Sequence, residues 1–228
     1  MRRARVYAAA AAVVVLVAIG FRACSTPSTG TDTDTDTGPV TPAATGEVAG
    51  RGPASTRHGV PGGWSHDESG AVAVAVSAVR LTGEIARAGF ITRTDMIETL
   101  ASARYGPTLA ADSAAQLGEM SGELGAAGVT VQSVTFTELP LTARVVHADR
   151  ASAAVEVWTV SVITVADVAA PRQVWRTVTV ELVWEAGDWR VDGWTTRSGP
   201  TPALAVSAPV ASAAEVLEVL SWPSAGGG

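Results

Sequence analysis

The pattern of apolar and polar positions divides the chain into four stretches with different periodicity. Val6 to Phe21 is an unbroken apolar run flanked by arginines, and residues 25–63 offer hardly any apolar side chain to bury. From Trp64 onward apolar residues recur at helical spacing, and beyond Val129 they follow the two-residue period of strands. The sequence therefore predicts an apolar segment, a linker, a helical part and a sheet part.

The apolar run predicts either a membrane anchor or an export signal. About 16 residues give a helix of roughly 24 Å, shorter than the roughly 30 Å hydrocarbon core of a bilayer. Three arginines precede the run and Arg22 follows it, so the positive-inside rule places the N-terminus in the cytoplasm. We expect residues 1–24 to be a single-pass anchor in the cell membrane with an extracytoplasmic C-terminal domain. Cleavage after Ala18-Ile19-Gly20 and lipidation of Cys24 stay open as alternatives.

Residues 25–63 predict a disordered linker. Alternating Thr and Asp, together with Gly, Pro and Ser, leave too little apolar surface to form a core. A calcium loop over Thr31–Thr37 is the alternative, but the turn glycine and distal glutamate of such a loop are not in register.

Three helices are predicted between the linker and the sheet. Ser65 and Glu68 have the spacing of a capping box that begins the first helix, and Gly89 is its expected stop. Thr92 is the expected cap of the second helix. The predicted helices cover residues 65–89, 92–103 and 106–125.

The sheet part predicts long antiparallel strands. They cover residues 129–139, 141–148, 153–165 and 174–184, with a return through Trp189–Asp192. In the 174–184 strand one face is apolar except for Arg176. Glu185–Asp188 predicts a tight hairpin turn, and Gly193 a bulge that redirects Trp194.

Helices followed by an antiparallel meander argue for an α+β domain whose curved sheet wraps the helices. We expect this domain to span residues 64–204, followed by a tail, residues 205–228, with one short helix that docks back on the sheet; binding to a neighbour is the alternative. With 47% hydrophobic residues the chain can form a real core, and its single cysteine excludes an internal disulfide.

Charge and composition argue against direct nucleic-acid binding. The formal net charge is −6, and all 16 basic residues are arginine. An acidic chain repels phosphate, so nucleic acid is not an expected partner.

No reactive constellation is visible in the sequence. His58, His66 and His147 are scattered, with no spacing typical of metal ligands, and no nucleophile motif or phosphate-binding loop is present. The inward-facing strand positions read Val, Leu and Trp, which fill a core or line an apolar pocket. We therefore predict no catalytic, cofactor-binding or metal-binding residues and no enzyme activity.

Five tryptophans gather in the sheet part. Trp184 and Trp189 flank the predicted turn on the apolar face, so we assign them to the core. Trp158 and Trp175 fall on the face shared with Thr and Glu, so they are the candidates for a partner surface, with a place in the core as the alternative.

Short segments in a fixed order carry a family resemblance. The segments are Gly59–Gly63, Glu68–Val72, Val157–Val160, Trp184 with Gly187–Val191, and Ser198–Pro202. Their order resembles that in membrane proteins of actinobacterial integrative and conjugative elements and, at greater distance, the NTF2-like periplasmic domains of VirB8 and TcpC. The resemblance covers about the last three-quarters of the chain and implies an NTF2-like cone of three helices on a curved sheet.

The resemblance implies a noncatalytic scaffold in a conjugative transfer or type IV secretion-like apparatus. Its expected partners are the membrane and other subunits of that apparatus, and a homo-oligomer stays open. One alternative is an exported or lipid-anchored protein that binds a small ligand in a deep, Trp-lined apolar pocket. Another is an NTF2-like enzyme, whose mark would be a buried carboxylate with a raised pKa in that pocket.

Overall fold

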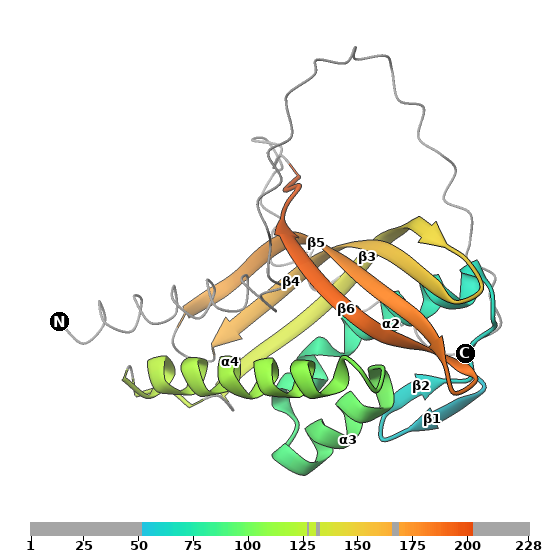
Figure 1. The fold of residues 1–228 in the computed structure, drawn as a ribbon. Helices are drawn as coiled ribbons and strands as arrows, with labels where there is room; N and C mark the ends of the chain where they lie inside the picture. The colour runs from blue at the N-terminus through green and yellow to red at the C-terminus, as the bar shows by residue number, and fades with distance from the viewer. Residues whose placement is uncertain (1–51, 127, 131–132, 166–168, 203–228) are drawn as a thin grey trace, which may run out of the picture.

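The structure, a computed structural model, describes residues 52–126, 128–130, 133–165 and 169–202. Within these residues it contains three helices and two antiparallel sheets, which confirms the predicted α+β class (Figure 1). The predicted anchor, Cys24, most of the predicted linker and the predicted tail helix lie outside the described residues.

The three helices precede the main sheet in the chain. They are α2 (Glu68–Arg87), α3 (Phe90–Leu100) and α4 (Gly106–Ala126). α2 buries a face of small side chains, of which Ala71, Ala75 and Ala78 are fully covered. α4 opens at Gly106 as predicted.

The first helix begins at a different cap from the predicted one. Asp67 is the N-cap of α2, and its Oδ1 accepts the Gly70 N–H at 2.8 Å. The hydroxyls of Ser65 and Ser69 donate to the same oxygen. These hydrogen bonds, above all the one from the Gly70 N–H, hold the pKa of Asp67 below its ordinary value. Ser65 therefore supports the cap because the carboxylate can accept several donors at once.

The junction between α2 and α3 also differs from the prediction. Gly89 has a φ of −60° and is the N-cap of α3, so it is not the left-handed stop of α2. Ala88 closes α2 instead, through its backbone N–H. α3 begins at Phe90 and ends at Leu100, which places Thr92 inside its first turn. Because only two residues separate the helices, there is no room for a separate stop and cap.

The main sheet is a meander of four antiparallel strands in the order β3-β4-β5-β6. The strands are β3 (Val134–Ala148), β4 (Ser152–Val165), β5 (Ala169–Glu185) and β6 (Asp188–Ser198). The strands predicted at 129–139 and 141–148 are one strand, β3, with a register shift after Pro140 and another after Val145. Proline has no backbone N–H to donate, but β3 is an edge strand, where a bulge accommodates it.

The β5–β6 hairpin is the predicted one. Ala186 and Gly187 in its turn have φ values of 54° and 81°, which suits the twist of the flanking strands. The predicted bulge near Gly193 appears as a register shift opposite Glu181 and Leu182. Beyond it, Trp194 is 5% exposed and joins the core.

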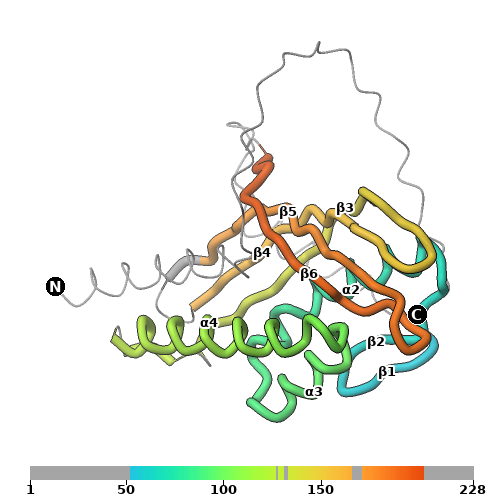
Figure 2. The backbone as a smooth tube through the Cα atoms, in the orientation of Figure 1, coloured from blue at the N-terminus to red at the C-terminus, as the bar shows by residue number. Residues whose placement is uncertain are grey.

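A short hairpin occupies the end of the segment predicted to be disordered linker. It consists of β1 (Ser55–Arg57) and β2 (Val60–Gly62). Val60 is 3% exposed and belongs to the core. Asp188, the first residue of β6, accepts the backbone N–H of Gly63 at 2.7 Å, which holds the hairpin beside the β5–β6 turn (Figure 2). Composition alone predicts a linker here. The segment is ordered because Val60 is buried and because Gly63 donates a hydrogen bond to Asp188.

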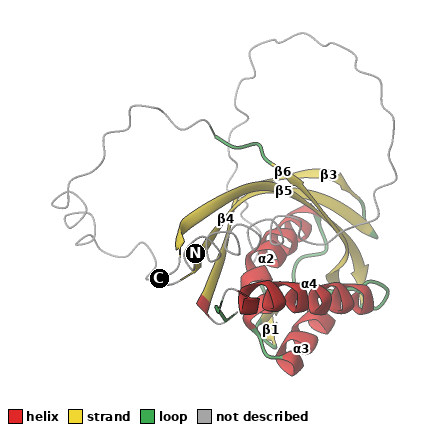
Figure 3. Cartoon of the chain, turned by 90° about the vertical axis from the view of Figure 1, so that its left-hand side faces the viewer, coloured by secondary structure: helices red, strands yellow, loops and turns green. Residues whose placement is uncertain are grey.

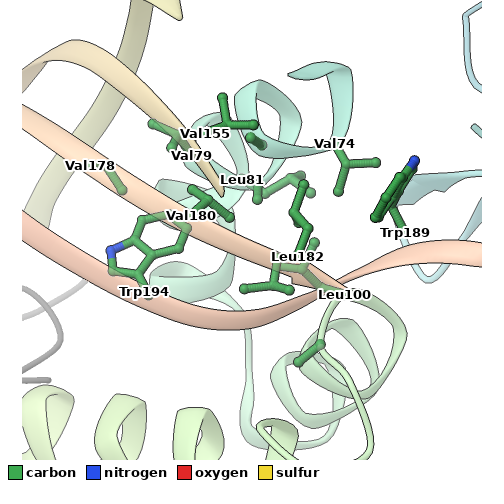
Figure 4. Packing of buried hydrophobic residues seen from close by; sticks show 14 of the residues in the cluster. Val74, Val79, Leu81, Leu100, Val155, Val178, Val180, Leu182, Trp189 and Trp194 are labelled. Carbon is green, nitrogen blue, oxygen red and sulfur yellow. The ribbon is translucent and has the colours of Figure 1, made fainter. Parts of the chain in front are cut away.

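The helices lie under the concave face of the curved sheet (Figure 3). Figure 4 shows the core between the layers, where Val178, Val180 and Leu182 of β5 face Val79 and Leu81 of α2. Among the described residues, no helix covers the convex face (Figures 1 and 3).

The helix and sheet layers approach most closely where α2 crosses β3. A Cβ added to Gly83 would lie 2.5 Å from the backbone oxygen of Phe136. Glycine is therefore required at this crossing for steric reasons.

Within the described part of the chain, α2 is long and apolar enough to cross a membrane by length and composition. Half of its apolar window is buried inside the fold, however. α2 is thus the central core helix of the domain, and the predicted anchor is a different segment.

Candidate functional site

Trp158 and Trp175, the predicted partner-surface residues, lie together on the convex face of the sheet. Trp158 pairs with Thr177 and Trp175 with Val160 in the β4–β5 register, so both indoles are on the face away from the helices. Their rings stack with centroids 5.0 Å apart and planes inclined by 29°. Both side chains are half-buried, so part of the stacked pair is open to solvent.

Apolar side chains extend this surface toward the edge strand. Leu139 pairs with Val160, the residue opposite Trp175, and is 45% exposed. Leu141, at the first β3 bulge, is 49% exposed. We call Leu139, Leu141, Trp158 and Trp175 the tryptophan face.

A groove of about 560 Å³ lies beside Trp158 on the same side of the sheet. The Trp158 indole N–H donates to the Pro200 carbonyl oxygen at 3.0 Å. The Thr177 hydroxyl donates to the Gly199 carbonyl oxygen at 2.9 Å. The segment that follows β6 is therefore fixed along one side of the groove.

Two arginines and one glutamate set the charge of the groove. Nη2 of Arg144 lies 2.6 Å from Glu156 Oε2, and Nη2 of Arg197 lies 3.6 Å from Glu156 Oε1. The Arg144 and Arg197 side chains are 73% and 57% exposed, whereas that of Glu156 is 17% exposed. The groove thus presents positive charge to solvent, next to an aromatic surface.

Trp184 and Trp189 serve the core, as predicted. Trp189 is 3% exposed and Trp184 packs against the same cluster, with the two rings edge to face at 5.4 Å. His66 stacks on Trp184 at 3.7 Å, and its Nε2 lies 2.6 Å from the Arg150 carbonyl oxygen. These contacts secure the start of α2 against the sheet.

A buried ion pair lies on the concave face of the sheet. Arg176 donates from Nε to Glu138 Oε1 at 3.2 Å and from Nη2 to Oε2 at 2.5 Å. The Glu138 and Arg176 side chains are 0% and 7% exposed. The hydroxyls of Thr159 and Ser161 donate to the two carboxylate oxygens at 2.9 Å and 2.7 Å. Each oxygen of Glu138 therefore accepts two hydrogen bonds.

The prediction that inward positions carry only Val, Leu and Trp is wrong at this ion pair. Arg176 is visible in the sequence as the single interruption of an apolar face. Glu138 cannot be assigned to the inward face from the sequence, because the strand break predicted at Pro140 leaves the orientation of this segment undetermined. A buried arginine requires a carboxylate nearby, and that requirement is the signal that points to Glu138.

A cavity of about 120 Å³ separates the helices from the concave face of the sheet. Its wall is almost entirely apolar and includes Ile97 of α3, Met120 of α4, Phe136 of β3 and Trp194 of β6. Arg176 lines the cavity at the edge of the buried ion pair. A Trp-lined cavity is the feature that the small-ligand alternative predicts.

In the residues that the structure describes, no group of three or more His, Cys, Asp or Glu side chains is placed to hold a metal ion. The three histidines are separate: His58 lies 3.8 Å from Asp95, His66 stacks on Trp184, and His147 lies 3.2 Å from Asp149.

No protein-family model and no curated protein sequence matches this chain. Among solved structures, the intermembrane space region of the chloroplast protein ARC6 is similar to it over 57% of this chain and 92% of that chain. The identity is 13% and the TM-score 0.35, values too low to carry an argument about fold or function. The resemblance to VirB8 and TcpC therefore stays a prediction.

Proposed function

We propose that this chain is a membrane-anchored, noncatalytic scaffold component of a conjugative transfer or type IV secretion-like apparatus, with an extracytoplasmic NTF2-like domain. The order of helices before an antiparallel meander supports the NTF2-like part. The observation that carries the scaffold role is the tryptophan face, where two stacked indoles and two exposed leucines lie on a sheet surface that none of the described helices covers.

Such a surface is typical of a protein interface. Single exposed apolar residues are common, but contiguous apolar patches with a charged border mark interaction sites. Tryptophan and arginine are enriched among the residues that dominate binding energy. The stack of Trp158 on Trp175 also fixes both rings before binding, so little side-chain entropy remains to be lost.

The charge of the groove indicates the chemistry of the partner. The Arg144 and Arg197 side chains are exposed, whereas that of Glu156, which pairs with both, is largely buried. A partner subunit that presents an apolar anchor flanked by carboxylates would complement both the rings and the guanidinium groups. We infer that another protein subunit of the apparatus supplies this surface.

The buried ion pair supports a noncatalytic role. A catalytic carboxylate needs an oxygen lone pair directed at substrate. Both oxygens of Glu138 are occupied by Thr159, Ser161 and Arg176. This arrangement is typical of a structural ion pair that fixes strand register.

The scaffold role is tested by photocrosslinking in cells that are transferring DNA. A photoreactive amino acid replaces Leu141 on the tryptophan face or, as the control, the exposed Ala115 of α4. We expect an adduct with the extracytoplasmic part of another membrane subunit of the transfer apparatus from position 141 and not from position 115. An adduct with no transfer protein, or the same adduct from both positions, would contradict the proposal.

Truncation of the indoles gives a functional readout. Trp158→Ala with Trp175→Ala should lower transfer frequency at least about tenfold, because an interface tryptophan contributes about 2 kcal/mol or more. The matched control is Phe90→Ala with Ile91→Ala, which removes side chains that are 72% and 75% exposed on α3. Equal losses in the two double variants, at equal protein levels, would count against the tryptophan face.

A further inference from the structure

The cavity under the concave face has no part in the proposed scaffold role. It lies on the helix side of the sheet, whereas the tryptophan face is on the other side. What the cavity can bind depends on its volume, on the side chains that line it and on the route by which a molecule reaches it from solvent.

Three of the polar side chains in the cavity wall, those of Thr82, Trp194 and Arg176, already have partners within the protein. The Thr82 hydroxyl donates to the Val79 carbonyl oxygen at 2.7 Å, and the Trp194 indole N–H donates to the Thr196 hydroxyl at 3.2 Å. Arg176 is held by Glu138. The remaining wall is mainly aliphatic and aromatic, so a water molecule inside would form few hydrogen bonds.

The size of the space decides which molecules fit. A cavity of roughly 150 Å³ lined by Leu, Ile and Phe stays dry and binds benzene. The present cavity, at about 120 Å³, has a similar volume and a similar wall. Apolar filling is favourable because it restores the dispersion contacts that the wall side chains lack.

Access is from the side between α2 and α4. Arg87, at the last turn of α2, and Gln116 and Leu117 of α4 line the cavity and are themselves exposed or half-buried. A small molecule can therefore enter beside these side chains without unfolding the sheet layer. Gln116, together with the buried Ser113, also offers an amide and a hydroxyl to a single polar group of the ligand.

We propose that this cavity is a binding site for a small, neutral, apolar molecule of about the size of benzene, entering between α2 and α4. The site is independent of the scaffold role, because its residues and those of the tryptophan face lie on opposite sides of the sheet.

The test compares three full-length proteins in the same detergent, with benzene as the probe. Ala86→Leu places a larger side chain in the cavity wall, and Ala115→Leu makes the same change on the exposed side of α4. We expect saturating benzene to raise Tm by a few degrees in the original chain and in Ala115→Leu, and to leave Ala86→Leu unchanged. Because partition into detergent is the same for all three, equal shifts or no shift would overturn the proposal.

A second measurement does not depend on a filled variant that folds. Trp194 lines the cavity and is 5% exposed, so benzene on the protein surface cannot reach its ring. Magnetisation transfer from benzene protons to the Trp194 indole, assigned by its loss in Trp194→Phe, is expected for an occupied cavity. Transfer to exposed side chains only would contradict an internal site.

Discussion

Glu138 and Arg176 place opposite charges in the buried, mainly apolar layer between the sheet and the helices. Removing two charges from water is costly, and their attraction compensates only when geometry is good and the remaining hydrogen bonds are satisfied. Both conditions hold, since two hydroxyls complete the shell of the bidentate pair. The consequence is asymmetric: the pair itself adds little stability, whereas loss of one partner leaves a buried charge.

We therefore expect Glu138→Gln to lower the free energy of unfolding by about 3–5 kcal/mol. Arg144→Met, which breaks a pair whose arginine is 73% exposed, should lower it by less than about 1 kcal/mol. Urea unfolding followed by tryptophan fluorescence measures both. The double variant Glu138→Leu with Arg176→Met should lose less than Glu138→Gln, and a double variant as unstable as the single one would show that charge burial is not the cause.

The start of α2 depends on the ionised form of Asp67. Its folded pKa lies below the ordinary value of 3.8, so its stabilising effect is complete above that pH and is lost as the pH falls through the lower folded value. Asp67→Ala should reduce stability by about 1 kcal/mol at neutral pH, and the difference from the original chain should shrink below about pH 4. Asp67→Asn retains an acceptor that does not titrate, so its urea midpoint should vary less over that range. A difference between Asp67→Ala and the original chain that stays constant with pH would contradict this assignment.

Replacing a helical glycine by alanine should have opposite effects on stability at Gly83, where α2 crosses β3, and at Gly118 of α4. Gly83→Ala adds a methyl group 2.5 Å from the Phe136 carbonyl oxygen, and the layers must separate, at a cost of about 1–3 kcal/mol. Gly118 of α4 has open space around it, so Gly118→Ala should stabilise by up to about 1 kcal/mol. Thermal unfolding by circular dichroism compares the two. A Gly83→Ala protein at least as stable as Gly118→Ala would show that the helix is not tightly seated.

The elements that the sequence predicts well are those whose local pattern matches their tertiary role. The β5–β6 hairpin follows from Glu185–Asp188 because Gly187 readily adopts the positive φ that the turn needs, and Ala186 adopts it as well. Pro140 misleads because local chemistry cannot show that β3 is an edge strand with a bulge. Trp158 and Trp175 can be placed on one face by their phase, but their stacking depends on the β4–β5 register. The position and size of the cavity are not predictable, since they depend on how three helices meet the sheet.

For the whole molecule, one curved sheet separates two different environments. Its concave face holds the core, the buried ion pair and the cavity. Its convex face carries the stacked indoles and the exposed arginines. Side chains alternate between the faces along each strand, so β4 and β5 contribute to both at once. A substitution at a convex-face position of these strands should therefore alter partner binding and leave ligand binding in the cavity unchanged. A substitution at a concave-face position should have the opposite effect.

The extent of the folded unit gives a prediction for the whole molecule. Val60 is 3% exposed and Gly63 donates to Asp188, so the domain begins before Trp64. A chain that starts at residue 52 should keep the urea midpoint of the full chain, whereas one that starts at residue 64 should lose about 2–4 kcal/mol, from burial of one valine and one hydrogen bond. Val60→Ala in the longer chain is the matched control and should show an intermediate loss. Equal midpoints for the two starts would mean that the β1–β2 hairpin rests on the domain without stabilising it.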